Sequence, residues 1–124
     1  MKAKFCTCRH CGNTISMVED HGVPVQCCGE AMHQILPGKT DGAQEKHVPV
    51  CETSGNKVMV TVGSVEHPMT PEHYIQWICL MTNQGCHYKF LSPTAPPKAC
   101  FLLCEGELVE EVYAHCNLHS LWKA

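Results

Sequence analysis

The residues from His73 to Thr82 read HYIQWICLMT, and the turn Asn83-Gln84-Gly85 leads from them into Cys86–Leu91, which reads CHYKFL. The first segment alternates between two sets of residues, as expected for a strand with two different faces. One set is Ile75, Trp77, Cys79 and Met81, and the other is Tyr74, Gln76, Ile78 and Leu80. In the second segment, Tyr88 and Phe90 share one face of an extended chain. The stretch therefore predicts two antiparallel strands joined by a turn.

Further segments of the same kind lie on both sides of this hairpin, separated by glycine-containing turns or by the proline-rich loop Ser92–Lys98. No segment has a convincing helical period, and the tail Cys116–Ala124 is expected to be too short to form a strand. Short strands at this spacing favour an antiparallel β-sandwich. The other expected strands are Val48–Glu52, Lys57–Val62, Ala99–Cys104 and Leu108–His115.

The first 36 residues differ from the rest, because they carry five cysteines and only short apolar runs. A segment below about 40 residues rarely buries enough surface to fold without a metal, disulfides or oligomerisation. Pro37-Gly38 indicates a boundary. We therefore expect two domains, a metal-stabilised one over residues 1–36 and a β-sandwich over residues 37–124.

Eleven of the 124 residues are cysteine and nine are histidine, whereas the formal net charge is −3. Such a charge argues against a nucleic-acid partner, which requires a dense basic face. No run approaches the roughly 18 apolar residues of a membrane span. No apolar stretch follows Met1-Lys2-Ala3-Lys4, so we expect no secretory signal, a cytoplasmic location and reduced, metal-binding thiols.

Four cysteines form two pairs with metal-ligand character. Cys8 and Cys11 have the common Cys-x-x-Cys spacing, and Cys27 and Cys28 are adjacent in sequence, which is unusual because neighbouring side chains normally diverge. Four thiolates would form a tetrahedral site for zinc or iron, and spacing alone does not separate the two metals. Cys6 is a rival ligand at a less common spacing, and we expect it to be a spectator.

A second group of possible ligands lies beyond residue 37. His47, His67 and His73 fall in or beside expected loops, and Cys116-x-x-His119 lies in the tail. Each histidine alone is more typical of a surface residue than of a ligand. Several imidazoles and one thiolate, brought together at one end of a sandwich, would suit iron, copper or zinc.

The motifs taken together resemble the desulfoferrodoxins, the two-iron superoxide reductases. The agreement runs in the family's order along almost the whole chain. The matching pieces are Cys8-x-x-Cys11-Gly12-Asn13, Cys27-Cys28-Gly29-Glu30-x-Met32, Thr40–Val50, Gly63-Ser64-Val65-x-His67-Pro68-Met69, His73-Tyr74-Ile75-x-Trp77-Ile78 and Cys116-Asn117-Leu118-His119-x-x-Trp122-Lys123.

The resemblance implies a desulforedoxin-like domain that holds iron with Cys8, Cys11, Cys27 and Cys28, followed by an immunoglobulin-like sandwich. In that sandwich it implies a catalytic iron in a plane of four imidazoles, with one axial thiolate and one open axial position. The expected activity is reduction of superoxide to hydrogen peroxide without oxygen release. A rubredoxin-like electron donor and a homodimer are implied as well. The corresponding ligands here are His47, His67, His73, His119 and Cys116.

Glu45 and Lys46 immediately precede His47, in a loop where we expect Gly42 to allow movement. An ammonium beside an open metal site would attract an anion and orient a water that delivers a proton. A carboxylate could occupy the vacant position of the ferric site. We therefore predict catalytic roles for both residues.

Two other functions remain open from the sequence. One is a zinc-stabilised binding module without catalysis, and the other is an electron-transfer protein with two iron centres. Five cysteines outside the motifs have no assigned role, and a redox function for any of them is a guess. Three are expected to be small buried hydrophobes (Cys51, Cys100 and Cys104), and two could approach each other across a hairpin (Cys79 and Cys86).

Overall fold

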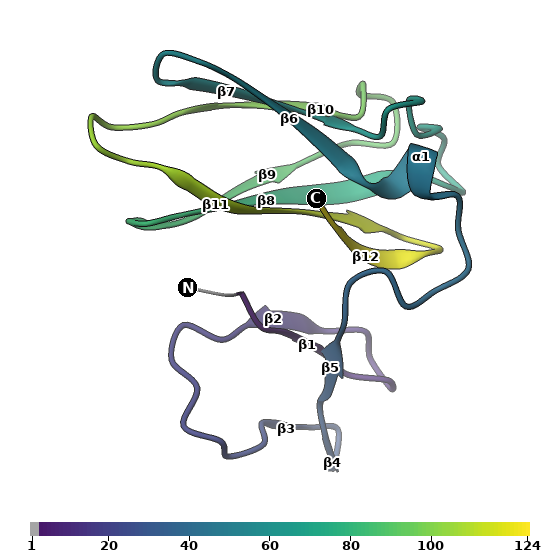
Figure 1. Ribbon diagram of the computed structural model, residues 1–124. Coiled ribbons are helices and arrows are strands. Elements are labelled where there is room, and N and C mark those ends of the chain that lie inside the picture. Colours follow the sequence, from purple (N-terminus) through teal and green to yellow (C-terminus); the bar gives the residue numbers. More distant parts are fainter. Residues whose placement is uncertain (1–2) are drawn as a thin grey trace. The chain divides into compact units, whose positions relative to one another are not determined.

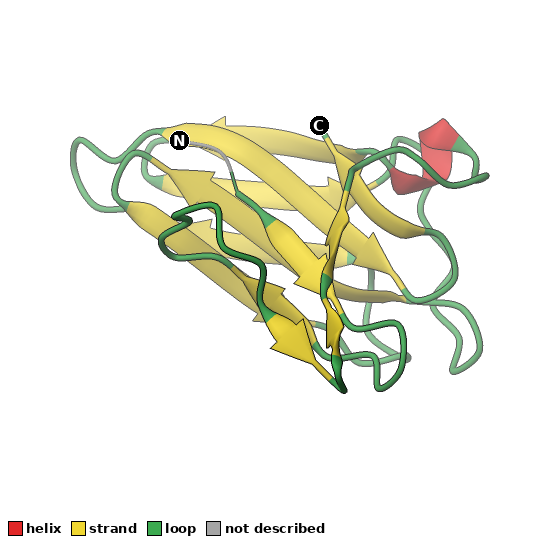
Figure 2. Ribbon diagram, turned by 90° about the horizontal axis from the view of Figure 1, so that it is seen from below, coloured by secondary structure: helices red, strands yellow, loops and turns green. Residues whose placement is uncertain are grey.

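The computed structural model describes residues 3–124, which form two compact units. The first unit ends at Leu36 and the second begins at Pro37, the position of the Pro37-Gly38 dipeptide. Strands dominate both units, and α1, over Gln44–His47, is the one helix among the described residues (Figures 1 and 2). No helix in the described part of the chain is long and apolar enough to cross a membrane.

The first unit contains a three-stranded antiparallel sheet in the order β2-β1-β5 and a two-stranded ribbon, β3-β4. Each strand has only two or three residues, so the unit has little regular structure and little core of its own. A metal site that joins its loops would supply the missing constraint. The strands are β1 Phe5–Thr7, β2 Thr14–Ser16, β3 Gln26–Cys27, β4 Glu30–Ala31 and β5 His33–Ile35.

The second unit is an antiparallel sandwich, as the sequence predicts. Within residues 37–124, a three-stranded sheet has the order β10-β7-β6 and a four-stranded sheet has the order β12-β11-β8-β9. Seven strands in sheets of three and four agree with the expected immunoglobulin-like architecture. The strands are β6 Pro49–Ser54, β7 Lys57–Val62, β8 Ile75–Thr82, β9 Gly85–Phe90, β10 Lys98–Leu102, β11 Val109–Cys116 and β12 Ser120–Lys123.

The core lies between the inward faces of these two sheets. Val58, Val60 and Val62 of β7 are almost fully buried, and they belong to one apolar cluster with Ile78 and Leu80 of β8. Burial of one such side chain contributes about 1.5–3 kcal/mol. A shift of β7 by one residue would turn all three valines outward, so the alternating pattern fixes the register.

Two expectations about local structure are wrong. The tail does form a strand, because a turn at residues 117–119 reverses the chain and β12 then pairs with β11, with Ala114 opposite Trp122. Ser120 takes a positive φ of 62° at this reversal. The helix α1 was also missed, since a single turn of four residues is too short to produce a hydrophobic period.

The ends of several sandwich strands place the proposed catalytic ligands in one region. His47 ends α1, His67 and His73 lie in the β7–β8 connection, and Cys116 and His119 lie at the β11–β12 turn. In Figure 1, α1 and the β11–β12 turn lie at the same end of the sandwich. Residues that are far apart in sequence thereby meet.

Candidate metal centres

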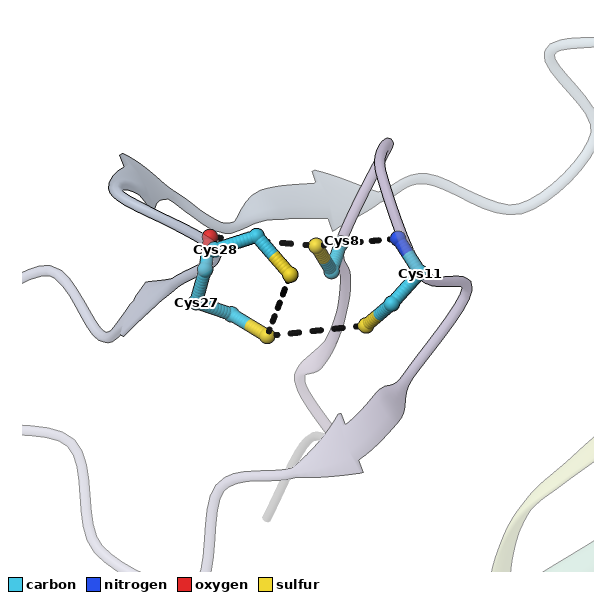
Figure 3. A group of neighbouring side chains, drawn as sticks. All are labelled: Cys8, Cys11, Cys27 and Cys28. Atoms are coloured by element: carbon cyan, nitrogen blue, oxygen red, sulfur yellow. Dashed lines mark hydrogen bonds between the residues drawn. The ribbon is translucent and has the colours of Figure 1, made fainter.

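The four cysteines of the first unit converge on one point (Figure 3). Their sulfur atoms all lie within 4.8 Å of one another. Cys11 Sγ is 3.6 Å from Cys27 Sγ, and Cys27 Sγ is 3.9 Å from Cys28 Sγ. In a tetrahedral site with metal–sulfur bonds of about 2.3 Å, the sulfurs lie about 3.8 Å apart. The cluster therefore has the dimensions of a four-thiolate metal site.

Backbone conformation explains how these side chains face the same way. The Gly12 N–H donates to the Cys8 carbonyl over 3.0 Å, which closes the tight turn around Cys11. Cys28 has a φ of 54°, in the left-handed region, and Gly29 follows with a φ of 76°. This unusual conformation brings together two adjacent side chains that diverge in an ordinary extended chain.

Whether the four cysteine thiols of this cluster lose their protons depends on a bound cation. Backbone N–H groups of Cys11 and His10 lower the pKa of Cys8 to about 6. Interactions with the Cys8 and Cys11 side chains raise the pKa of Cys27 to about 12, and they raise the pKa of Cys28 as well. One thiolate is thus favourable, and further thiolates repel it until a metal ion balances their charge. This donor set fits iron or zinc.

The second cluster consists of four imidazoles arranged around a square. Neighbouring ring centroids are 4.5–5.1 Å apart in the order His47, His67, His73, His119, and the diagonal pair His47 and His73 is 6.2 Å apart. His47 Nε2 lies 3.2 Å from His67 Nε2 and 3.1 Å from His119 Nδ1. Two nitrogens bound at right angles, with bonds of about 2.1 Å, lie about 3.0 Å apart.

A buried thiol completes the second cluster. Cys116 is fully buried, and its Sγ lies 3.8 Å from His119 Nδ1. Burial raises the pKa of Cys116, whereas the N–H groups of Leu118 and His119 act in the opposite direction. A metal ion would therefore stabilise the thiolate, and the two N–H groups would hold its remaining lone pairs.

Hydrogen bonds beyond the cluster set the imidazole tautomers. The Nδ1–H of His47 donates to the Ala43 carbonyl over 2.8 Å, and that of His67 donates to the Pro68 carbonyl over 2.7 Å. Because a carbonyl only accepts, both Nδ1 atoms carry a proton and both Nε2 atoms keep a lone pair for a metal.

Burial keeps these rings neutral. It lowers the pKa values of His47 and His73, and it lowers that of His67 to about 4. His73 Nε2 is buried and has no hydrogen-bond partner among the described residues. Such an orphaned nitrogen fits a metal ligand, because a metal ion satisfies its lone pair.

The thiol loop is attached directly to the segment that carries His73. Asn117 Oδ1 accepts from the Tyr74 N–H over 2.9 Å, and Asn117 Nδ2 donates to the Glu72 carbonyl over 3.0 Å. These two bonds attach Asn117 to the residues immediately before and after His73. They keep the loop that carries Cys116 and the ring of His73 in a fixed relation.

Comparison with known proteins agrees with this geometry. The family model described as Desulfoferrodoxin matches residues 39–124. The chain belongs to the desulfoferrodoxin family. It is 45% identical to a desulfoferrodoxin from Nitratidesulfovibrio vulgaris over 94% of this chain and 91% of that protein. The four-cysteine group and the group of four histidines and one cysteine match the family's two-iron arrangement.

Two solved structures extend the comparison. The superoxide reductase from Treponema pallidum matches with a TM-score of 0.84 and 40% identity, over 100% of this chain and 99% of that one. The superoxide reductase (1Fe-SOR) from Giardia intestinalis matches with a TM-score of 0.52 and 35% identity, over 64% of this chain and 95% of that one. The family resemblance and the fold expected from it are confirmed.

The two charged residues predicted to act in catalysis lie on α1 and are both exposed. Burial is the main cause of the lowered pKa of His73, and the charge of Lys46 contributes in the same direction. The Lys46 ammonium therefore lies within electrostatic range of the imidazoles. The Glu45 carbonyl accepts from the Val65 N–H over 2.9 Å and from Ser64 Oγ over 3.3 Å, which holds α1 beside the β7–β8 connection.

Three further residues of this family member contribute to the site and were not assigned to it from sequence. Trp122 packs on His47, and Gly63 and Gly42 allow close approaches around α1. A Cβ on Gly42 would lie 3.0 Å from Trp122 Cζ2, so this glycine provides space, and the movement expected of its loop stays a prediction. The available signal was a glycine shortly before His47 and another before His67, although it did not show what each glycine contacts.

The remaining cysteines are all free thiols. Cys6 is buried outside the four-cysteine cluster, and Cys51 packs partly buried against the core. Cys104 is exposed, so its expected burial is wrong, because it lies in the turn after β10. Burial raises the pKa of Cys79 to about 12, which makes it unreactive. His115 is half-buried and stacks on Trp77 with the ring planes 7° apart.

Proposed function

We propose that the protein is a superoxide reductase that converts superoxide to hydrogen peroxide at the second centre. The observation that carries the proposal is the square of four imidazoles with one buried thiol beside it. Five protein donors leave one position of a six-coordinate iron for substrate. The two similar solved proteins are both described as superoxide reductases, which supports the same activity here.

The proposed iron ligands fall into two sets. Bound iron would supply the single electron that superoxide accepts. Neutral imidazoles would favour the ferrous state because they add no negative charge, whereas the Cys116 thiolate would add electron density to the iron. The first set is Cys8, Cys11, Cys27 and Cys28, and the second is His47, His67, His73, His119 and Cys116.

We assign Lys46 to substrate attraction and proton delivery. Its exposed ammonium lies on α1, directly before a ligand, where it attracts the anionic substrate. Reduction of superoxide to hydrogen peroxide also consumes two protons, and Lys46 Nζ can hold a water that delivers one of them. Glu45 would supply a carboxylate ligand to the iron after turnover.

The domain roles follow from the same proposal. Residues 1–36 form a desulforedoxin-like iron domain, and residues 37–124 form the catalytic domain. Support comes from the Giardia protein, which is described as a 1Fe superoxide reductase and matches 64% of this chain. A rubredoxin-like electron donor, a homodimer and a cytoplasmic location complete the proposal, and they rest on the family resemblance.

The test uses the full chain, loaded with iron under anaerobic conditions and exposed to superoxide pulses. The proposal predicts one hydrogen peroxide for each superoxide and no release of oxygen. Oxygen release would indicate a dismutase. Redox-active iron without superoxide consumption would favour an electron-transfer protein, and a colourless zinc protein would favour a binding module. Each of these three results would refute the proposal.

A variant pair tests the axial ligand within the same experiment. Cys116→Ser should abolish the absorption band of the ferric thiolate and leave the colour of the first centre unchanged. Cys104→Ser is the matched control, because Cys104 is exposed and lies outside both clusters. Survival of the band in Cys116→Ser would remove Cys116 from the ligand set.

A further inference from the structure

Trp122 contacts two of the proposed equatorial ligands through two different parts of its indole. The Nε1–H donates to the His119 carbonyl over 2.9 Å. The indole also packs against the His47 ring, with the centroids 4.9 Å apart and the planes tilted by 30°. Trp122 is only 3% exposed, and its pairing with Ala114 of β11 fixes its place. One rigid side chain therefore links two ligands that lie 72 residues apart in sequence.

The His119 carbonyl receives a second hydrogen bond from Thr40 Oγ1. Two donors occupy both lone pairs of this oxygen and fix the peptide plane that follows His119. His119 faces the cluster with Nδ1, the ring nitrogen nearer the backbone. The fixed peptide plane anchors the backbone of His119, and only two side-chain torsions then decide where Nδ1 lies.

A short segment, Thr40–Ala43, covers the same pair of ligands. The Ala43 carbonyl accepts from His47 Nδ1, and a Cβ on Gly42 would lie 3.2 Å from His47 Cε1 and 3.0 Å from Trp122 Cζ2. The segment thus contacts His119 through Thr40, Trp122 through Gly42, and His47 through Gly42 and Ala43. These contacts leave the His47 ring little freedom to rotate or withdraw.

We propose that Trp122 is a positioning residue that holds His47 Nε2 and His119 Nδ1 at the spacing that iron requires. Thr40 acts with it through the shared His119 carbonyl. The two nitrogens lie 3.1 Å apart without any bridging group from the protein, which is close to the spacing of about 3.0 Å for adjacent equatorial ligands. This inference rests on the proposed iron site, and it concerns how tightly and in what geometry that site holds iron.

Two single variants and their combination test the role. Trp122→Phe keeps an aromatic ring beside His47 and removes the indole donor. Thr40→Val removes the other donor at an exposed position, where loss of folding is not expected. Thr82→Val is the matched control, because it removes a buried hydroxyl at the far end of β8, where Thr82 donates to Glu107.

Three measurements are made on the full chain: the rate of iron loss from the second centre to a chelator, the energy of the ferric thiolate absorption band, and the melting temperature of the metal-free protein. Loss of an outer-sphere partner typically weakens a metal site roughly 10- to 100-fold. We expect iron loss to accelerate by roughly that range in Trp122→Phe, by less in Thr40→Val and by most in the double variant, with a shifted band. Thr82→Val should lower the melting temperature and change neither iron property.

The results separate the inference from the function on which it rests. If wild-type protein holds iron in the second centre and both Trp122→Phe and the double variant release it at the wild-type rate with an unchanged band, the positioning role is wrong. A lower melting temperature as the sole effect would also overturn it, because this is what a purely structural contact predicts. A wild-type protein that binds no iron at the four histidines would instead refute the proposed function.

Discussion

Gly63 lies where β7 leads into the β7–β8 connection, and the backbone of α1 passes directly over it. A Cβ at this position would lie 2.3 Å from the Glu45 carbonyl oxygen and 2.7 Å from the Lys46 carbonyl carbon. Both are backbone atoms, so no side-chain rotation relieves the contact. In Gly63→Ala, α1 and β7 must move apart by at least about 0.7 Å to reach the 3.0 Å that real Cβ contacts keep.

This displacement affects both stability and the proposed iron site. Overpacking of a well-packed region costs about 1–3 kcal/mol, and each kcal/mol lowers the melting temperature of a domain of this size by about 4–8 °C. We expect a fall of roughly 5–20 °C in the melting temperature. His47 moves with α1, and a misplacement of 1 Å can reduce a rate about 100-fold. The rate with superoxide should therefore fall roughly 10- to 100-fold.

The assays are thermal unfolding by circular dichroism, iron content after anaerobic loading, and the rate of superoxide consumption. Gly106→Ala is the matched control, because Gly106 has a φ of 80° but no atom within 4 Å of an added Cβ. Backbone strain there costs about 1–2 kcal/mol, so the control loses stability and keeps a normal iron site. Gly63→Ala with wild-type stability and rate would refute the reasoning, and so would equal losses of rate in both variants.

Three further predictions concern charge and metal. The Thr82 hydroxyl, with help from His87, lowers the pKa of Glu107 to about 2. The stability from this carboxylate is therefore complete above about pH 4.5 and disappears as the pH falls toward 2. The urea midpoint of the metal-free protein can be measured by tryptophan fluorescence across this pH window. As the pH falls, the midpoint should decrease less steeply in Glu107→Gln than in the wild type. Parallel pH dependences of the two midpoints would contradict the prediction. Lys46→Ala should reduce the rate constant for the reaction with superoxide roughly tenfold and weaken its salt dependence. Lys57→Ala, at the opposite end of β7, should change neither property. If pulse radiolysis gives Lys46→Ala the same rate constant as the wild type, this role for Lys46 is excluded. Removal of the metal should abolish amide protection in residues 3–36 while the sandwich strands remain protected, and unchanged protection in the first unit would contradict a stabilising metal.

Much of the sandwich could be predicted because its signals are local. Valines recur at every second position of residues 57–62, and the observed strand β7 has the bounds predicted for it. The missed strand β12 had no such signal, since its four residues pair only because a tight turn returns them to β11. Its formation depends on a partner strand rather than on its own pattern.

The ligand types were predictable for a similar reason. Cys8 and Cys11 are close in sequence, so the spacing alone predicts a shared metal, whereas the adjacent Cys27 and Cys28 required the left-handed conformation at Cys28 to face one point. For the histidines, sequence and family resemblance predicted which residues take part. Their order around the square depends on where three separate loops end.

By itself, the sequence determined most of the strand pattern, the chemistry of the two donor sets and the family, because these depend on residue type and on short spacings. The tertiary structure alone decided that His119 approaches with Nδ1, that Trp122 joins His119 to His47, and that Gly42 and Gly63 provide room for neighbouring groups. Each of these features is a contact between residues far apart in the chain. Such contacts arise only when the packed sheets bring their connecting loops together, and no local pattern of residues records them.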